Sequence, residues 1–305
     1  MRALEVSPSK QKHPSTRLSL MPWVTTSSVD ALCISTRDGL AQLGRTGARF
    51  GIPQAGQQRS LVNETARQRF RQSATDEERS RLSKYDDESD VGLYRALEML
   101  RWPLCFDELV GNGFGPQEHP ASVTRTVSGD WLTAMSGHVM RGGRHFTEFT
   151  ITAEEPRPFV SLGIIRPVSL TNGIGLEADW EGSVNPVHVA SNYKSAVSEK
   201  LRARRTANWG NSYVHCCTYH CFEGQCRWTD WINTGVAWPD WQGQEGLVGS
   251  GTIGLLLDLD EGTLSVFKNG RLCGVMKDGM DGEYCWFVAL CSACKISLSR
   301  GLAPK

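Results

Sequence analysis

The chain has 305 residues, and its 33 Lys and Arg balance its 33 Asp and Glu. A formal net charge of zero gives no global attraction to nucleic acid or to a membrane surface. No apolar run approaches the roughly 20 residues that a membrane helix requires, and the N-terminus has no continuous apolar region of a secretory signal. We therefore predict no nucleic-acid partner, no membrane association and a cytoplasmic location, with the nucleus as the alternative.

The first segment of the chain has the composition of a tail. Residues 1–62 are rich in Ser, Thr, Gly, Gln and Arg, and their apolar groups follow no sustained period. Such a segment buries too little apolar surface to offset the loss of chain entropy on folding. We predict a disordered basic tail over residues 1–62.

A short helical and acidic lead-in is predicted over residues 63–117. Thr75 followed by Glu78 forms a capping-box pattern, and the acidic run "DDESD" occupies residues 86–90. Apolar residues then recur at helical spacing, at Leu93, Ala96, Leu97 and Leu100. We expect this helix to pack on the following domain, because apolar stripes usually mark core contact. A partner-binding helix is the alternative.

From residue 118 to residue 305 the pattern changes to strands and turns. Thr147, Phe149 and Ile151 alternate with polar residues, as in a half-buried strand. Further strands are predicted at "PFVSLGII", "YCWFVAL" and "KISLS", and near Ser212–Cys217 and Cys226–Trp231. No helices of 10–15 residues alternate with them. The fold class is therefore all-β, an antiparallel β-sandwich.

A calcium loop and a β-meander are the two interpretations of "LLLDLDEGTLSVFKNGRLCGV", Leu255 to Val275. Counted from Asp258, the sixth position is Thr263 and the twelfth is Asn269, whereas a calcium loop needs Gly and Glu there. Asn269-Gly270 is instead a strong signal for a type I′ hairpin turn. We predict three antiparallel strands, at Ile253–Leu259, Leu264–Lys268 and Arg271–Met276.

The chain has ten cysteines, and "HCCTYHCFEGQC" from His215 to Cys226 holds six potential zinc ligands. No second ligand pair follows at the usual interval, and aromatic residues interleave with the cysteines. We expect two strands joined at Glu223-Gly224, with the cysteines as small buried apolar side chains. Structural zinc is the alternative. No cofactor is predicted.

A long connection, residues 168–205, precedes "NWGNSYV" and ends in a basic cluster of Lys200, Arg202, Arg204 and Arg205. Loops on a rigid sandwich often carry recognition. We expect a solvated loop here, because runs of surface charge are ordinary. The alternative, a functional one, is an acidic or phosphate-bearing partner that docks at this cluster.

A second candidate is the Trp-rich stretch "WTDWINTGVAWPDWQGQEG". Trp228 and Trp231 fit the core, whereas Trp238 and Trp241 flank Pro239-Asp240 and are expected to be displayed. Trp is enriched among residues that dominate binding energy in interfaces. We find no nucleophile elbow, phosphate-binding loop or HExxH pattern, so we predict that the protein is not an enzyme.

Several of these motifs together resemble the SPRY (B30.2-like) domain, over roughly Pro120 to Leu302. The most specific element is Gly254-x3-Asp258-x5-Leu264-x4-Asn269-Gly270. Two further motifs occur in the right order, Gly143-Arg144-His145 and Trp209-Gly210-x-x-Tyr213. The resemblance implies a bent sandwich of two antiparallel sheets, concanavalin-like, that binds partners through loops at one end. It implies no catalysis.

We therefore expect the protein to be an interaction module that binds a peptide or a protein surface and acts as an adaptor. The alternative is a lectin-like sandwich that stacks glycans on Trp238 or Trp241, with Gln242, Gln244 and Glu245 nearby. Relatives of the SPRY domain often join ubiquitin-ligase machinery, but Cys33 and Cys105 are too few for a RING or B-box site. A link to a ligase would therefore need a separate subunit. The candidate partner-binding residues are Trp209, Tyr213, Arg202, Arg204, Arg205, Trp238, Asp240 and Trp241.

Overall fold

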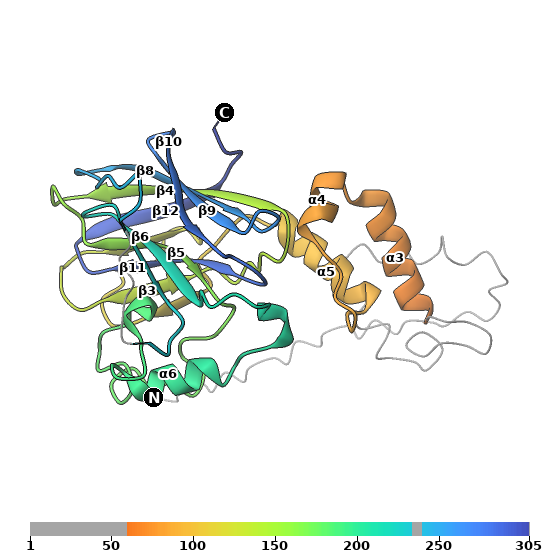
Figure 1. Ribbon diagram of the computed structural model, residues 1–305, viewed down its shortest axis with the longest axis horizontal. Coiled ribbons are helices and arrows are strands. Elements are labelled where there is room, and N and C mark those ends of the chain that lie inside the picture. Colours follow the sequence, from red (N-terminus) through yellow and green to blue (C-terminus); the bar gives the residue numbers. More distant parts are fainter. Residues whose placement is uncertain (1–59, 234–239, 305) are drawn as a thin grey trace, which may run out of the picture.

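The computed structural model describes residues 60–233 and 240–304. Two antiparallel sheets of six strands each are stacked face to face (Figure 1). In spatial order, the first sheet contains β1 (Glu108–Val110), β3 (Leu132–Met135), β11 (Cys285–Leu290), β5 (Val160–Ile165), β6 (Cys216–His220) and β7 (Gln225–Thr229). The second contains β10 (Arg271–Asp278), β9 (Thr263–Lys268), β8 (Gly251–Asp258), β4 (Arg144–Ala153), β12 (Cys294–Arg300) and β2 (Ser122–Arg125). The predicted all-β antiparallel sandwich is confirmed.

The inner core lies between the two sheets. On β4, Phe149 and Ile151 point inward and are buried, while Thr150 and Thr152 between and beyond them are exposed. This alternation follows from the two-residue period of a strand. In contrast, β5 and β11 are buried at every position. Another part of the chain therefore covers the outer face of the first sheet.

That cover is the long connection after β5. It contains η1 (Pro186–His188), α6 (Ser195–Arg202) and η2 (Ala207–Trp209), and Figure 1 shows α6 beneath the first sheet. Trp180, Val197 and Leu201 are fully buried in a second core, against outward-facing residues such as Phe287. The prediction of a solvated loop is wrong here, because the connection supplies its own apolar side chains and forms a third layer.

The predicted meander is confirmed as β8, β9 and β10. Asn269 and Gly270 have φ values of 49° and 78°, as a type I′ turn requires. Asp258 accepts hydrogen bonds from the backbone N–H groups of Asp260 (3.2 Å) and Glu261 (3.1 Å). Asp258 therefore stabilises a turn. Among the described residues, no group of three or more acidic, His or Cys side chains could hold a metal ion.

The cysteines of the β6–β7 hairpin are buried, as predicted. Cys216 packs in the outer core, and its neighbour Cys217 packs in the inner core with Cys226. Adjacent residues of a strand point to opposite faces, so the cysteines do not converge on one centre. Burial raises the pKa of the Cys216 and Cys217 thiols well above the ordinary value.

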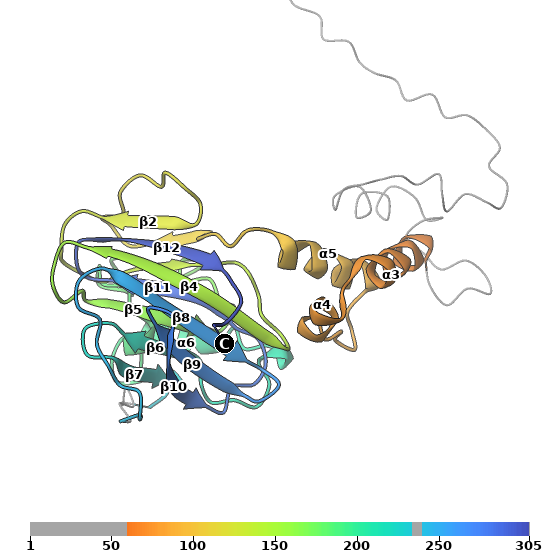
Figure 2. The same cartoon turned by 90° about the horizontal axis from the view of Figure 1, so that it is seen from above.

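The lead-in forms three helices at one side of the sandwich, α3 (Leu61–Ser73), α4 (Asp76–Arg81) and α5 (Asp90–Arg101), as Figure 2 shows. None of the described helices is long and apolar enough to span a membrane. The capping box is confirmed, since Thr75 Oγ1 accepts from the Glu78 N–H (3.1 Å) and Glu78 Oε2 accepts from the Thr75 N–H (2.8 Å). Residues 1–59 of the predicted tail lie outside the described residues.

The apolar stripe of α5 packs within this helical unit. Leu93, Leu97 and Leu100 form a small core with Ala74 and Leu82, so the prediction that this stripe packs on the following domain is wrong. Polar contacts join the helices to the sandwich instead.

β1 also lies before residue 118 and pairs with β3, so the sandwich begins earlier in the chain than the boundary predicted at residue 118.

Candidate partner-binding site

A cleft of about 670 Å³ opens between α6 and the chain that leaves β7. The helix is amphipathic: it buries Val197 and Leu201 in the outer core and leaves Ser195 and Arg202 exposed. The Ser198 hydroxyl donates to the Trp231 carbonyl and ties the helix to the end of β7. The residues that line the cleft include Ser195, Glu199, Arg202, Ala203, Arg205, His215 and Ile232.

The basic cluster of the sequence is only partly available. Lys200 Nζ lies 2.7 Å from the Asp179 carboxylate, and the Arg204 guanidinium donates to the carbonyls of Ser169 and Asn172. These two side chains hold the connection in place, so a partner-binding role for Arg204 is corrected to a structural one.

Two arginines of the cluster reach the cleft. The Arg205 guanidinium donates one hydrogen bond to the Gly210 carbonyl (3.2 Å). The Arg202 guanidinium has no hydrogen bond, ion pair or ring contact within residues 60–233 and 240–304. Within the part of the chain that the structure describes, the Arg202 guanidinium is therefore available to a ligand.

An aromatic cluster lies under the cleft. Trp209 and Trp231 are buried, with ring centroids 5.2 Å and 5.1 Å from that of His215. Burial, with Arg166 nearby, lowers the pKa of His215 to about 4, so its ring is neutral at pH 7. Trp209 is 1% exposed, and the prediction that it contacts a partner directly is wrong. It supports the cleft from beneath.

Two exposed side chains accompany the cleft. Ile232 lines it and is 43% exposed, and Tyr213, two residues before His215, is 78% exposed. An exposed aromatic of this kind contributes to interfaces at low cost in side-chain entropy. Tyr213 therefore stays a candidate, although it does not line the cleft.

The prediction that Trp241 is displayed is also wrong. Trp241 is 9% exposed, and its Nε1 donates to the Gly224 carbonyl (2.8 Å). Its ring packs in the inner core with Tyr219, Cys226 and Cys273, where β7 and β10 are the edge strands of the two sheets. Trp241 therefore closes an edge of the sandwich. Trp238 lies outside the described residues, and Asp240 is exposed.

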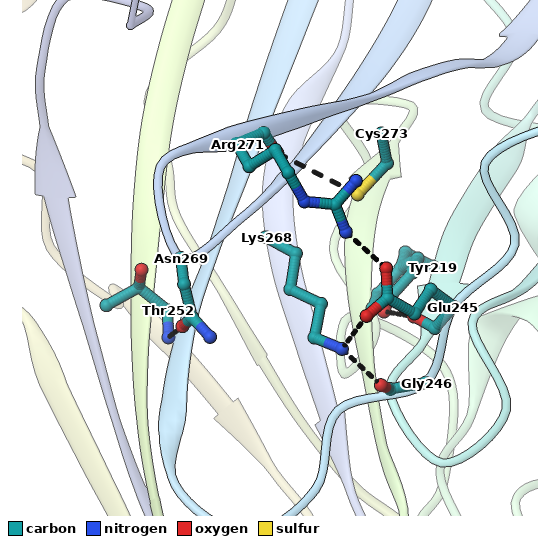
Figure 3. A network of polar contacts seen from close by, with 8 residues as sticks. All are labelled: Tyr219, Glu245, Gly246, Thr252, Lys268, Asn269, Arg271 and Cys273. Atoms are coloured by element: carbon teal, nitrogen blue, oxygen red, sulfur yellow. Dashed lines mark hydrogen bonds and ion pairs between the residues drawn. The ribbon is translucent and has the colours of Figure 1, made fainter.

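A polar network, shown in Figure 3, fixes the segment after Trp241 to the β9–β10 hairpin. The Glu245 carboxylate pairs with Lys268 (2.5 Å) and with Arg271, which lower its pKa. The Tyr219 hydroxyl donates to the Glu245 carbonyl, and Lys268 donates to the Gly246 carbonyl (2.8 Å). Glu245, expected beside a bound sugar, instead holds the segment in place.

We expect Trp241→Ala to lower the free energy of unfolding by about 3–5 kcal/mol, because it removes a buried ring and opens the edge of the core. Urea unfolding followed by circular dichroism measures this. Tyr213→Ala, at the exposed ring, serves as the control and should change the free energy by less than about 0.5 kcal/mol. Equal effects of the two substitutions would contradict the structural role of Trp241.

Several described cysteine thiols have a raised pKa, which makes them poor candidates for a catalytic nucleophile. Burial raises the pKa of Cys105 to about 11 and of Cys294 to about 12. A thiol that stays protonated at pH 7 is a poor nucleophile. Burial also lowers the pKa of His138 and His188 to about 4.

No family model matches the chain, and no curated protein matches it. Three similar solved structures are the SPRY domain of human HERC1, the TRIM65 PSpry domain and a human SPRY domain. The first has 15% identity and a TM-score of 0.38, with 62% of this chain and 98% of that chain covered. The second has 14% identity and a TM-score of 0.41, with 67% and 97% covered. The third has 13% identity and a TM-score of 0.37, with 63% and 97% covered. All three are SPRY-type domains, the family that the motifs resemble, and likeness at this level says nothing of function.

Proposed function

We propose that the chain is a non-enzymatic interaction module that binds a peptide segment of a partner protein in the cleft beside α6. The observation that carries this function is the cleft itself. Its volume of about 670 Å³ lies within the range of about 300–1,000 Å³ typical of ligand sites. Its walls combine two arginines and a glutamate with hydroxyl groups and the apolar side chain of Ile232.

The cleft is fixed before any partner arrives. Ser198 and Lys194 bond to the carbonyls of Trp231 and Trp180, and Lys200 pairs with Asp179, so α6 is tied to its surroundings along its length. A preformed site loses less entropy on binding than a mobile one. This favours recognition of a flexible peptide by a rigid surface.

In the cell, such a module acts as an adaptor that holds its partner near other machinery. Any ubiquitin-ligase activity would come from a separate subunit. Glycan binding is less well supported, because Trp241 is buried and Glu245 is engaged in ion pairs.

Filling the cleft tests this function. We expect Ala203→Trp, at a lining position, to abolish capture of partner proteins from cell lysate by the full chain. Ala196→Trp makes the same change at an exposed position of α6 that does not line the cleft, and it should capture the same proteins as the wild type. Capture that survives Ala203→Trp would show that partners bind elsewhere.

A further inference from the structure

We propose, on the premise that the function proposed above holds, that the cleft selects an acidic peptide: a Glu or Asp side chain of the partner pairs with Arg202 beside an apolar residue that packs on Ile232. Arg202 is exposed on the last turn of α6 and has no partner within the described part of the chain. Its planar guanidinium can donate two parallel hydrogen bonds to a carboxylate.

The charges around the cleft favour a single carboxylate. Among the residues that line it, Arg202 and Arg205 are positive and Glu199 is negative, which leaves an excess of one positive charge in the lining. The His215 ring adds no charge at pH 7, because burial holds its pKa at about 4. A phosphate group carries about −1.5 to −2 charges and is usually met by a cluster of arginines, so the cleft fits a carboxylate better.

The floor of the cleft also favours a ligand that brings hydrogen-bond acceptors. Within the described residues, Nδ1 of His215 has no hydrogen-bond partner. The His215 side chain is buried and lines the cleft. Buried polar groups are normally paired, and Nδ1 donates when it carries the proton of the neutral ring. A carboxylate supplies acceptors only.

The apolar wall gives the second half of the recognition. Ile232 follows the buried Trp231, which is held by the bond between its Nε1 and the Pro186 carbonyl (3.1 Å). Asp230 accepts from the N–H groups of Ile232 (2.9 Å) and Asn233 (3.0 Å). The exposed Ile232 side chain is therefore presented by a fixed turn, as a hydrophobic contact for the residue next to the acid.

Selection from a phage-displayed peptide library on the immobilised full chain tests this inference. We expect the wild type to enrich peptides with Asp or Glu at one constant position. Arg202→Glu should instead enrich Lys or Arg at that position, and Arg202→Lys should keep the acidic preference. Arg157→Glu makes the same charge change at an exposed residue that does not line the cleft, and it should select the wild-type set.

A synthetic version of the best selected peptide then measures the effect. Replacing its constant acid by the amide should weaken binding to the wild type about tenfold, the effect of losing one charge-assisted contact. It should not weaken binding to Arg202→Glu, because the introduced carboxylate repels the acid of the peptide but not the amide. A phosphoserine peptide that binds more than tenfold tighter than the Glu peptide would overturn the carboxylate assignment.

The remaining outcomes distinguish failure of the acidic specificity from failure of peptide binding in this cleft. Enriched peptides without a constant acid, or the same peptides on the wild type and on Arg202→Glu, would overturn the acidic specificity and leave peptide binding intact. No enriched peptide at all, or peptides that bind equally to Ala203→Trp, would overturn both the specificity and the use of this cleft.

Discussion

Glu88→Ala is expected to lower the free energy of unfolding by about 3–5 kcal/mol, the cost of leaving one member of a buried ion pair alone. Glu88 and Arg141 join the helical unit to the sandwich across 2.8 Å, and their side chains are 14% and 7% exposed. Arg141 also lies over the Tyr85 ring, 5.0 Å from its centroid. Denaturant unfolding of the full chain measures the change.

An exposed ion pair provides the control for Glu88→Ala. Glu118 lies 3.4 Å from Lys295, and both side chains are well exposed. Glu118→Ala should therefore cost less than about 1 kcal/mol. The double variant Glu88→Leu/Arg141→Met removes both buried charges and should recover most of the lost stability. If Glu88→Ala cost no more than Glu118→Ala, the junction would not stabilise the fold.

The same junction bears on where the folded unit begins. The Tyr85 hydroxyl donates to the Glu283 carboxylate (2.7 Å), and Arg300 donates to the Leu100 carbonyl. A chain that starts at residue 118 would lose these partners together with β1. We therefore propose that residues 60–304 fold as one unit, and the binding experiments above use the full chain for this reason.

Features set by near neighbours could be predicted from the sequence. The Asn269-Gly270 turn and the Thr75–Glu78 capping box each depend on residues a few positions apart. The alternation along β4 depends only on the period of a strand. Local rules of this kind act through backbone geometry and short contacts, so one sequence suffices to find them.

Features that depend on residues far apart in the chain cannot be predicted from local patterns. Trp241 was expected to be displayed because nothing near it in the sequence shows that β7 and β10 leave an open edge. Glu245 pairs with Lys268 and Arg271, more than 20 positions away, without any motif. These contacts exist only once the sheets are stacked.

The candidate site shows the same division. The basic cluster indicates Arg202 and Arg205, which line the cleft. The sequence marks His215 only as a possible zinc ligand and gives no signal for Ile232. A usable signal was present for the helix: Val197 and Leu201, four positions apart, form an apolar stripe that indicates a packed α6 over Ser195–Arg202.

Arg166 connects the fold to the cleft. Its side chain is fully buried and donates to the carbonyls of Asp281 (2.8 Å), Glu283 (3.0 Å) and Ser212 (3.3 Å). Its guanidinium lies 4.1 Å from the Tyr284 ring centroid and 5.7 Å from that of Trp209. One side chain therefore holds together two loops and the aromatic floor of the cleft.

We expect Arg166→Met to lower the free energy of unfolding by about 3–5 kcal/mol, because three carbonyls lose the donor that a fully buried side chain gives them, while the volume is largely kept. Peptide affinity should fall as well at a temperature where the variant is still folded, because Trp209 and His215 lose their support. Arg157→Met, at an exposed arginine 5.4 Å from the Phe222 ring, should cost less than about 1 kcal/mol. If folded Arg166→Met kept its peptide affinity, Arg166 would contribute to stability alone. The aromatic residues under the cleft would then keep their arrangement without the guanidinium.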